Sequence, residues 1–208
     1  MSEEFPIIDF PKLECPFIRE NVNGKYIVTP EINPGYEWVF EEPGVKAVDK
    51  LHGTNVCVQM DKKGIVRAVD NRKNRILTQF ILGKTVSIQQ ARFYEGIIHA
   101  LEKGCFEFAE GRVYGELIGP SINGNLHEIS YHIFVPFNYL VERCHWKSWI
   151  NNKYPKTYEA ISDWMREMPS LYSQKQKKDT YAEGVIFYSQ TGKMAKLRRD
   201  MYPWYEKG

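Results

Sequence analysis

Short runs in which apolar and polar residues alternate predict most of the secondary structure of this chain. Val45–Lys50, Asn55–Asp61 and Ile65–Val69 are rich in β-branched residues, and glycines interrupt the chain between them. This is the pattern of neighbouring strands joined by turns. Val113–Ile118 and Ile133–Val141 are more continuously apolar, which predicts buried strands.

The last part of the chain predicts a hairpin. Gly184–Tyr188 and Met194–Arg198 are strand-like and flank Thr191-Gly192, a turn sequence. Before it, Lys175-Gln-Lys-Lys178 predicts a basic loop, either a solvated turn or a contact for RNA phosphate.

Two segments show helical spacing instead. Ser87 and Gln90 form a capping box, in which each side chain satisfies a backbone N–H of the other residue. One predicted helix face behind it, in a helix ending near Gly104, consists of Ile88, Ala91, Tyr94, Ile98 and Leu101. The same spacing recurs before Pro169, at Tyr158, Ile161, Met165 and Met168. Paired strands with helices between the groups predict an α+β fold of antiparallel sheets flanked by helices.

Length and composition predict one domain, residues 1–208, with its own core. The chain has 208 residues and 14% aromatic residues, so burial is not limiting. Residues 1–43 hold six of the eleven prolines and nine acidic against three basic residues, a balance of −6, which predicts extended pieces and turns packed on the domain. The remainder has a balance of +8, which suits a body that handles phosphates.

Nothing in the sequence predicts export or membrane insertion. The first residues lack the basic and then apolar pattern of a signal peptide, and no apolar run is long enough to cross a bilayer. The four cysteines, which contain no Cys-x-x-Cys pair, predict reduced thiols rather than a zinc site or a disulfide framework. We expect a cytoplasmic protein, or a viral protein that acts in the host cell.

Lys50 is the first candidate catalytic residue. It lies at the end of a predicted strand and is followed by His52-Gly53 and a second strand. A lysine amine held in this way can act as a covalent nucleophile once it has lost its proton. An exposed lysine in a surface hairpin is the competing interpretation, because Lys-x-x-Gly is a common sequence.

Three further strand ends carry ionisable residues. Glu116 and Glu183 each lie beside a glycine, which has no side chain to block a ligand. Lys196 and Arg198 are two residues apart, so both cations project from one face of a strand. Taken singly, these are ordinary edge carboxylates and a solvated basic face. Together they are the groups that nucleotidyl transfer needs, because the amine attacks phosphorus, cations spread the negative charge, and carboxylates hold a metal or ribose hydroxyls.

In this order, the four segments resemble motifs I, III, IV and V of the covalent nucleotidyltransferases, which are the polynucleotide ligases and mRNA-capping enzymes. The segments are Lys50-Leu-His-Gly-Thr-Asn55, Tyr114-Gly-Glu-Leu117, Glu183-Gly-Val-Ile186 and Lys196-Leu-Arg198. His52 and Asn55 make the first motif most similar to the RNA ligase 2 family, since DNA ligases and capping enzymes usually have Asp and Arg there. The resemblance implies an ATP-grasp-like adenylyltransferase fold.

The resemblance also implies two further contacts. The family carries an arginine that contacts nucleotide phosphate after the second strand, and Arg72 fits the spacing better than Arg75. An aromatic ring stacks on the base in the family. Phe134-Val-Pro-Phe137-Asn resembles that motif, with Phe137 preferred, although Pro136 and Asn138 depart from the pattern and core packing is the alternative for either ring.

The implied activity is that of an ATP-dependent RNA ligase that uses Mg²⁺ or Mn²⁺. Lys50 attacks ATP and forms lysyl-AMP, AMP passes to a 5′-phosphate RNA end, and a 3′-hydroxyl then seals the break. Glu183 is the candidate metal carboxylate and Glu116 a ribose or metal contact, with Lys196 and Arg198 as catalytic cations. Leu51, His52 and Asn55 are implied contacts of the nucleotide.

Other functions remain open at this point. A DNA ligase, a GTP-dependent capping-type enzyme and a catalytically weak module that binds RNA ends share these motifs. Many ligases carry a C-terminal oligonucleotide-binding domain, and because the sequence ends ten residues after Arg198 we expect this chain to act without one. We therefore expect strong self-adenylylation, weaker sealing of RNA ends or of a nicked duplex, and a protein partner that supplies nucleic-acid affinity.

Overall fold

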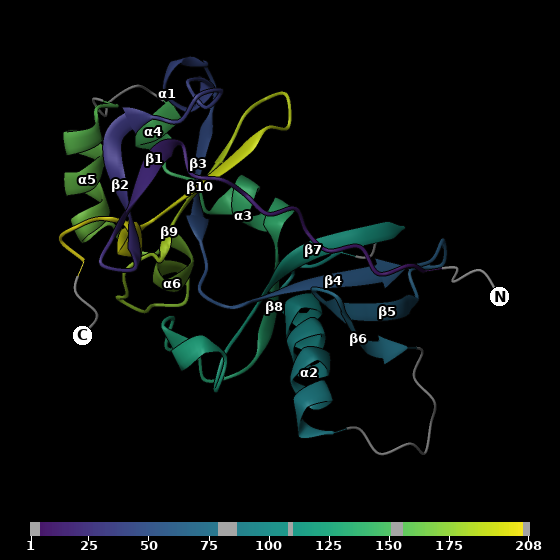
Figure 1. The fold of residues 1–208 in the computed structure, drawn as a ribbon. Coiled ribbons are helices and arrows are strands. Elements are labelled where there is room, and N and C mark those ends of the chain that lie inside the picture. The colour runs from purple at the N-terminus through teal and green to yellow at the C-terminus, as the bar shows by residue number, and fades with distance from the viewer. Residues whose placement is uncertain (1–4, 79–86, 108–109, 151–155, 206–208) are drawn as a thin grey trace. The chain divides into compact units, whose positions relative to one another are not determined.

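The structure is a computed structural model that describes residues 5–78, 87–107, 110–150 and 156–205 (Figure 1). The chain forms two compact units. The first consists of the residues up to Pro11 together with His52–Leu140, and the second of Lys12–Leu51 together with the residues from Val141 onward. Residues 1–43 are thus divided between the units. Each unit is built on antiparallel strands with helices beside them, which confirms the predicted α+β class.

The first unit is built on a five-stranded antiparallel sheet with the strand order β6-β5-β4-β7-β8. A helix, α2, packs beside β7 and β8 (Figure 1). The elements are β4 (Thr54–Met60), β5 (Val66–Asn71), β6 (Asn74–Thr78), α2 (Ile88–Glu102), β7 (Gly111–Ile118), a 3₁₀ turn (Asn123–Asn125) and β8 (Ile133–Pro136).

Helix α2 begins as predicted but buries a different face. Ser87 Oγ accepts from the Gln90 N–H at 3.2 Å, and Gln90 Oε1 accepts from the Ser87 N–H at 3.1 Å, which confirms the capping box. The predicted apolar face is wrong, because Ile88 is 80% exposed and the buried residues are Gly96, Ile97 and Ala100. The glycine decides the face: a Cβ on Gly96 would lie 3.3 Å from the Phe134 backbone nitrogen. The helix therefore approaches the sheet along the side that carries Gly96.

Strand β8 is shorter than predicted. It ends at Pro136, and helix α3 (Phe137–Arg143) follows where the sequence predicted a strand up to Val141. Proline has no N–H to donate to a neighbouring strand, so regular pairing stops there. Phe137 is consequently the first residue of a helix.

Gly115 in β7 allows β8 to approach closely, so we expect a larger residue at this position to destabilise the fold. A Cβ at this position would lie 2.5 Å from the Val135 carbonyl oxygen and 2.6 Å from the Phe134 ring. We expect Gly115→Ala to lower the free energy of unfolding by about 3 kcal/mol, because the strands must move apart. Gly104→Ala is the control: it meets no atom within 4 Å, so it costs about 1 kcal/mol for its left-handed backbone alone. Equal losses in urea unfolding of the two variants would contradict the prediction.

The second unit holds two sheets. One is the hairpin β1-β2, and the other is an antiparallel sheet with the order β10-β9-β3. The strands are β1 (Phe17–Val22), β2 (Lys25–Ile32), β3 (Lys46–Lys50), β9 (Gly184–Tyr188) and β10 (Met194–Arg198). The helices are α1 (Trp38–Glu41), α4 (Lys147–Ile150), α5 (Tyr158–Glu167), α6 (Leu171–Lys175) and a 3₁₀ turn (Arg199–Met201).

Two regions of the second unit differ from the prediction. The segment predicted as extended pieces and turns contains a hairpin, whose turn Asn23-Gly24 has positive φ at both residues and whose register shifts between Phe17 and Arg19. Asn-Gly between two strands is a hairpin signal that the proline content obscured. The predicted basic loop begins inside a helix, because Lys175 is the last residue of α6. The predicted hairpin of β9 and β10 and the helix α5 are confirmed.

One face of the β10-β9-β3 sheet forms part of a tryptophan-rich core. Val185, Phe187 and Leu197 are fully buried on this face, and Trp149 lies against Phe187 with 4.9 Å between ring centroids. Side chains alternate between the faces of a strand, so the residues between these positions point to the opposite face. That opposite face carries Lys50, Lys196 and Arg198.

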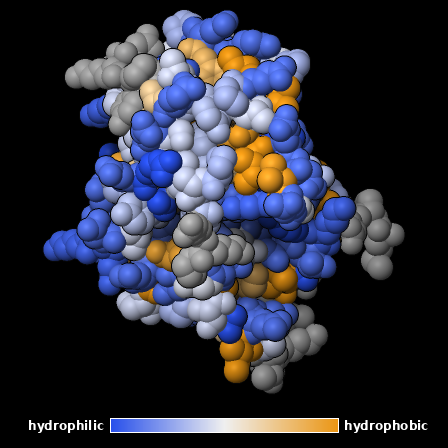
Figure 2. All heavy atoms as spheres, turned by 60° about the vertical axis from the view of Figure 1, so that its left-hand side comes forward, coloured by the Kyte–Doolittle hydropathy of each residue, from blue (hydrophilic) through white to orange (hydrophobic). Residues whose placement is uncertain are grey.

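The exposed residues and the cysteines differ in character. Figure 2 shows one face of the molecule, on which hydrophilic residues predominate and hydrophobic residues form small, separate groups. All four cysteines are buried and free. Among the helices of the described residues, none has the length and apolarity that crossing a bilayer requires.

Candidate active site

The register of the β10-β9-β3 sheet places the predicted nucleophile and both predicted catalytic cations on one face. Lys50 and Arg198 lie on either side of Gly184, in the two strands that flank β9. Lys196 lies opposite Ile186, two residues further along β9. Residues opposite one another in an antiparallel sheet, and residues two apart in a strand, share a face. The structure thus brings together the lysine of one motif and the cations of another, 146 residues later.

Glu183 joins these cations. Its Oε2 lies 2.6 Å from Lys50 Nζ, and its Oε1 lies 3.9 Å from the Arg198 guanidinium. The Lys50 side chain is 21% exposed and that of Glu183 is 13% exposed, so the pair is open to a ligand without being fully solvated. Leu51, also predicted to contact the nucleotide, is buried, and its carbonyl oxygen lies 3.5 Å from the same Nζ.

The surroundings of Lys196 change the pKa of its side chain. Burial, and then the positive charges of Arg198 and Lys50, lower the pKa of the Lys196 ammonium. Three cations that share one face favour a dense negative charge, such as a triphosphate. This face is therefore suited to bind phosphate groups.

Gly184 lies in the middle of this face for a reason other than the predicted one. The sequence suggested that glycines beside Glu116 and Glu183 leave room for a ligand. A Cβ on Gly184 would instead lie 2.2 Å from the Leu197 carbonyl oxygen, and Gly115 faces the Phe134 ring in the core. Both glycines allow neighbouring strands to approach one another.

Asp49, next to the predicted nucleophile, anchors the end of β3 on the opposite, buried face. Its Oδ2 accepts from the Ser170 hydroxyl at 2.8 Å and from the Tyr172 N–H at 2.9 Å, at the start of α6. The Asp49 N–H also donates to the Cys144 carbonyl at 2.8 Å. These bonds fix the backbone that carries Lys50. Sequence analysis did not identify this anchor, because Ser170 is 121 residues away.

Burial makes Asp49 the source of a predicted pH dependence. Desolvation raises the pKa of this carboxyl from 3.8 to about 6, against the lowering effect of its bonds to Tyr172 and Ser170. A carboxyl with a higher pKa in the folded chain binds its proton more tightly there than in the unfolded chain. It therefore stabilises the fold below about pH 4, and this stabilisation, about 3 kcal/mol, is lost as the pH rises through about 6.

We expect Asp49→Asn to remove this part of the pH dependence. The free energy of unfolding of the wild type, measured with urea from pH 4 to pH 7, should fall more steeply than that of the variant. Asp163→Asn is a matched control, because the Asp163 side chain is 81% exposed. Parallel curves for the wild type and Asp49→Asn would show that Asp49 does not titrate in this range.

Two residues predicted to contact the nucleotide meet in the first unit. Asn55 in β4 lies directly opposite Glu116 in β7, so both side chains are on the same face of the five-stranded sheet. Asn55 is 7% exposed. An amide and a carboxylate side by side offer the donor and acceptors that ribose hydroxyls require.

Neighbouring polar residues fix the backbone around His52 and Asn55. The His52 N–H donates to His127 Nε2 at 2.9 Å, and His127 is 1% exposed. The Asn71 amide donates to the Asn55 carbonyl and to Thr54 Oγ1, both at 2.7 Å. Sequence analysis missed His127 and Asn71, and a lone buried histidine or asparagine gives no spacing signal.

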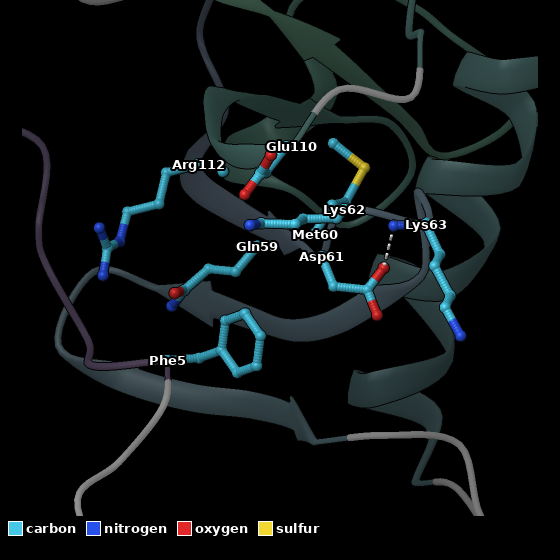
Figure 3. A pocket seen from close by; sticks show the side chains of 9 residues that line it. Phe5, Gln59, Met60, Asp61, Lys62, Lys63, Glu110 and Arg112 are labelled. Carbon is cyan, nitrogen blue, oxygen red and sulfur yellow. Dashed lines mark hydrogen bonds between the residues drawn. The ribbon is translucent and has the colours of Figure 1, made fainter.

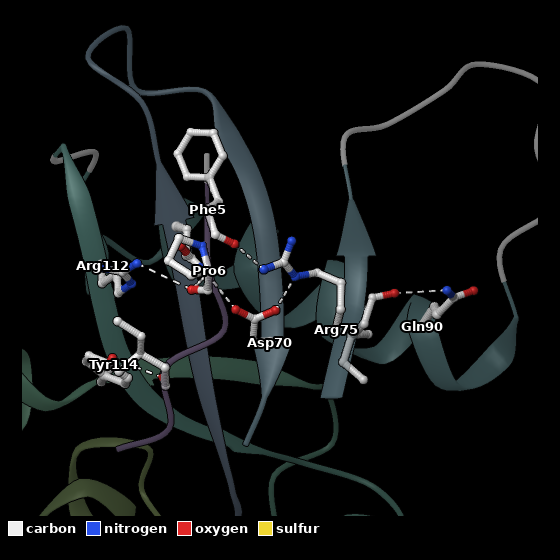
Figure 4. A network of polar contacts seen from close by, with 10 residues as sticks. Phe5, Pro6, Asp70, Arg75, Gln90, Arg112 and Tyr114 are labelled. Carbon is white, nitrogen blue, oxygen red and sulfur yellow. Dashed lines mark hydrogen bonds and ion pairs between the residues drawn. The ribbon is translucent and has the colours of Figure 1, made fainter. Parts of the chain in front are cut away.

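The two candidate arginines occupy different places. Arg72 is exposed in the turn between β5 and β6 with φ of 52°. Arg75 in β6 is paired with the buried Asp70 and also donates to the Phe5 carbonyl (Figure 4). Arg75 thus has a structural role in this unit, whereas Arg72 has its guanidinium at the surface. The preference for Arg72 stays a prediction.

The two candidate phenylalanines also differ in how far they are buried. Phe134 is fully buried and packs on the Phe106 ring, with 5.4 Å between centroids, so it belongs to the core. Phe137 is partly exposed at the start of α3, where its ring can meet a ligand. A base contact by Phe137 stays a prediction.

The candidate metal carboxylates, Glu183 and Glu116, suit a metal ion that is bound mainly by the phosphates of the nucleotide. Within the described residues, no three His, Cys, Asp or Glu side chains gather as a metal-binding group. Magnesium in nucleotide enzymes commonly takes one or two carboxylates and completes its shell with phosphates and water. Glu183, beside the three cations, fits such a role.

Comparisons with known proteins find a family model and several solved structures that are similar to this chain. A family model described as RNA ligase matches residues 45–201. Naegleria gruberi RNA ligase with PPi is 18% identical, with a TM-score of 0.49, over 95% of this chain and 60% of that one. A mutant of the same ligase with ATP and Mn is 19% identical, with a TM-score of 0.48, over 93% of this chain and 62% of that one.

The chain spans about three fifths of the length of these ligases. No curated protein sequence matches it. The matched residues 45–201 include every segment from Lys50 to Arg198 on which the prediction of nucleotidyl transfer depends.

Proposed function

Because the chain belongs to the RNA ligase family, we propose that it is an ATP-dependent RNA ligase that acts through a covalent lysyl-AMP. The observation that carries the proposal is the setting of Lys50. Its Nζ lies 2.6 Å from Glu183, and the cations of Lys196 and Arg198 share the same sheet face.

In the first step the Lys50 amine attacks the α-phosphorus of ATP. A P–N bond forms, the bond to the β-phosphate oxygen breaks, and pyrophosphate leaves. Only the neutral amine can attack. Lys196 and Arg198 stabilise the negative charge that builds up on the phosphates.

Two further steps complete the proposed reaction. A 5′-phosphate oxygen of RNA attacks the phosphorus of lysyl-AMP, which frees the Lys50 nitrogen and leaves AMP on the RNA end. A 3′-hydroxyl then attacks the 5′-phosphorus of that end and expels AMP. His52, Asn55 and Glu116 would contact phosphate or ribose groups, and Phe137 the base. A divalent metal held by Glu183 would neutralise phosphate charge.

Labelling with ATP tests the reaction class. We expect the protein, incubated with magnesium and α-labelled ATP, to carry an acid-labile label through denaturing electrophoresis, because a phosphoramidate bond survives denaturation but not acid. EDTA should prevent the labelling. Equal or stronger labelling by GTP would favour a capping-type enzyme, and no labelling by either nucleotide would contradict the proposal.

The substrate is the finer part of the proposal. His52 and Asn55 in the first motif support RNA rather than DNA ends, as in the RNA ligase 2 family that the motif resembles. We expect 5′-phosphate RNA ends, free or in a nicked duplex, to be sealed faster than the same DNA ends. Faster sealing of an all-DNA nick would contradict this choice.

A further inference from the structure

The N-terminal segment Phe5–Phe10 lies across the polar face of the five-stranded sheet. The Phe5 carbonyl accepts from Arg75, and the Pro6 carbonyl accepts from Gln59 at 3.2 Å and from Arg112 at 3.3 Å (Figure 4). Further along, the Ile8 carbonyl accepts from the Tyr114 hydroxyl at 3.1 Å. The contacts come from three strands, β4, β6 and β7, so the segment is held along its length.

This is the face that carries Asn55 and Glu116. Gln59 lies opposite Arg112, and Asn55 opposite Glu116, in the same pair of strands. Positions four residues apart in a strand share a face. The segment therefore reaches from the far end of β4 and β7 toward the residues proposed to contact the nucleotide.

Phe10 ends the segment against the predicted base-stacking ring. Its ring lies 4.8 Å from that of Phe137, edge to face, with an interplanar angle of 63°. It also lies 5.4 Å from the ring of Tyr114, at an interplanar angle of 59°. Phe10 and Phe137 are both only partly exposed. The Phe10 ring thus limits the rotamers that the Phe137 side chain can adopt.

We propose that Phe10 is a positioning residue for the nucleotide base, holding Phe137 in the orientation in which a base can stack on it. This inference rests on the proposed function. A ring that is already ordered loses less entropy when it binds a base, and edge-to-face aromatic pairs are themselves favourable. Loss of the Phe10 ring should therefore weaken ATP binding about three- to tenfold.

Competition is the opposite possibility for the same contact. If Phe10 occupied the place of the base, ATP would have to displace it, and its removal would strengthen ATP binding. The two possibilities predict opposite changes in KM for ATP when the Phe10 ring is removed.

The test compares Phe10→Ala with Phe5→Ala in the formation of lysyl-AMP at increasing ATP concentrations. Both changes remove a phenylalanine ring from the same segment, but Phe5 lines a separate pocket of about 430 Å³ beside Met60 and Lys62 (Figure 3). For Phe10→Ala we expect KM for ATP to rise about three- to tenfold with little change in the maximal rate. Phe5→Ala should behave as the wild type, and Phe10→Tyr should restore the wild-type KM.

One further variant and a folding measurement complete the test. Phe10→Leu keeps apolar volume without a ring and should raise KM like Phe10→Ala, and it replaces that variant if Phe10→Ala does not fold, as judged by circular dichroism. An unchanged or lower KM in the folded Phe10 variants, with a labelled wild type, would overturn the positioning role alone. A wild type that ATP does not label would overturn the proposed function and this inference together.

Discussion

Lys50→Ala is expected to abolish the labelling of the protein by α-labelled ATP. In the proposed reaction the label is bound to the Lys50 nitrogen, which lies 2.6 Å from Glu183, and alanine has no amine to form that bond. Lys50→Arg should be equally inactive, because it keeps the positive charge and loses the amine. Labelled ATP, denaturing electrophoresis and mass mapping of the modified peptide provide the measurement.

Lys46 offers a matched control within the same strand. Lys46 and Lys50 are both in β3, four residues apart, and their side chains share a face. The strand rise separates them by about 13 Å. We expect Lys46→Ala to be labelled as the wild type is. A label on Lys50→Ala, or its loss from Lys46→Ala as well, would contradict the assignment of the nucleophile.

Glu183→Gln is expected to reduce the rate of lysyl-AMP formation by at least about 100-fold. The amide keeps the size of the carboxylate but loses the charge that holds Lys50 and Arg198 and that would bind a metal. Removing one preorganised electrostatic contact from an active site typically has an effect of this size. Single-turnover labelling at saturating ATP and magnesium measures it.

Asp200→Asn separates the role of Glu183 from a general loss of negative charge. Asp200 Oδ1 lies 3.1 Å from Arg198 Nε, so this change also removes a carboxylate that is paired with Arg198. Asp200 is 35% exposed, and a pair of this kind contributes little. We expect at most a few-fold change in rate. Similar losses of rate in both variants would show that a general loss of negative charge, and not the contact of Glu183 with Lys50, slows the formation of lysyl-AMP.

Alternation along strands explains why the face that carries the catalytic cations of the proposed reaction could be predicted. Lys196 and Arg198 are two residues apart, and the buried Leu197 between them shows which face is internal. The strand at Lys50 and the hairpin of β9 and β10 were equally clear from local sequence. The local sequence does not specify that β3 pairs with β9. The expectation that Lys50 lies near Lys196 and Arg198 came from the proposed chemistry, which needs all three at one nucleotide.

Features that depend on distant contacts could not be predicted in this way. The buried face of α2 follows from Gly96 against β8, and not from the apolar spacing that begins at Ile88. Phe137 begins a helix because Pro136 ends the pairing of β8. The anchoring of Asp49 by Ser170 and the contact of Phe10 with Phe137 join segments more than 100 residues apart.

By itself, the sequence determined the class of fold, the strands that carry the reactive groups, and the lysine motif that indicates nucleotidyl transfer. These follow from side-chain period and residue chemistry within a few positions of the chain. Only the tertiary structure decided which helix face is buried, which phenylalanine is available to a ligand, and what holds Lys50 and Phe137 in place. Those outcomes depend on close packing and on hydrogen bonds between remote segments, which no local pattern specifies.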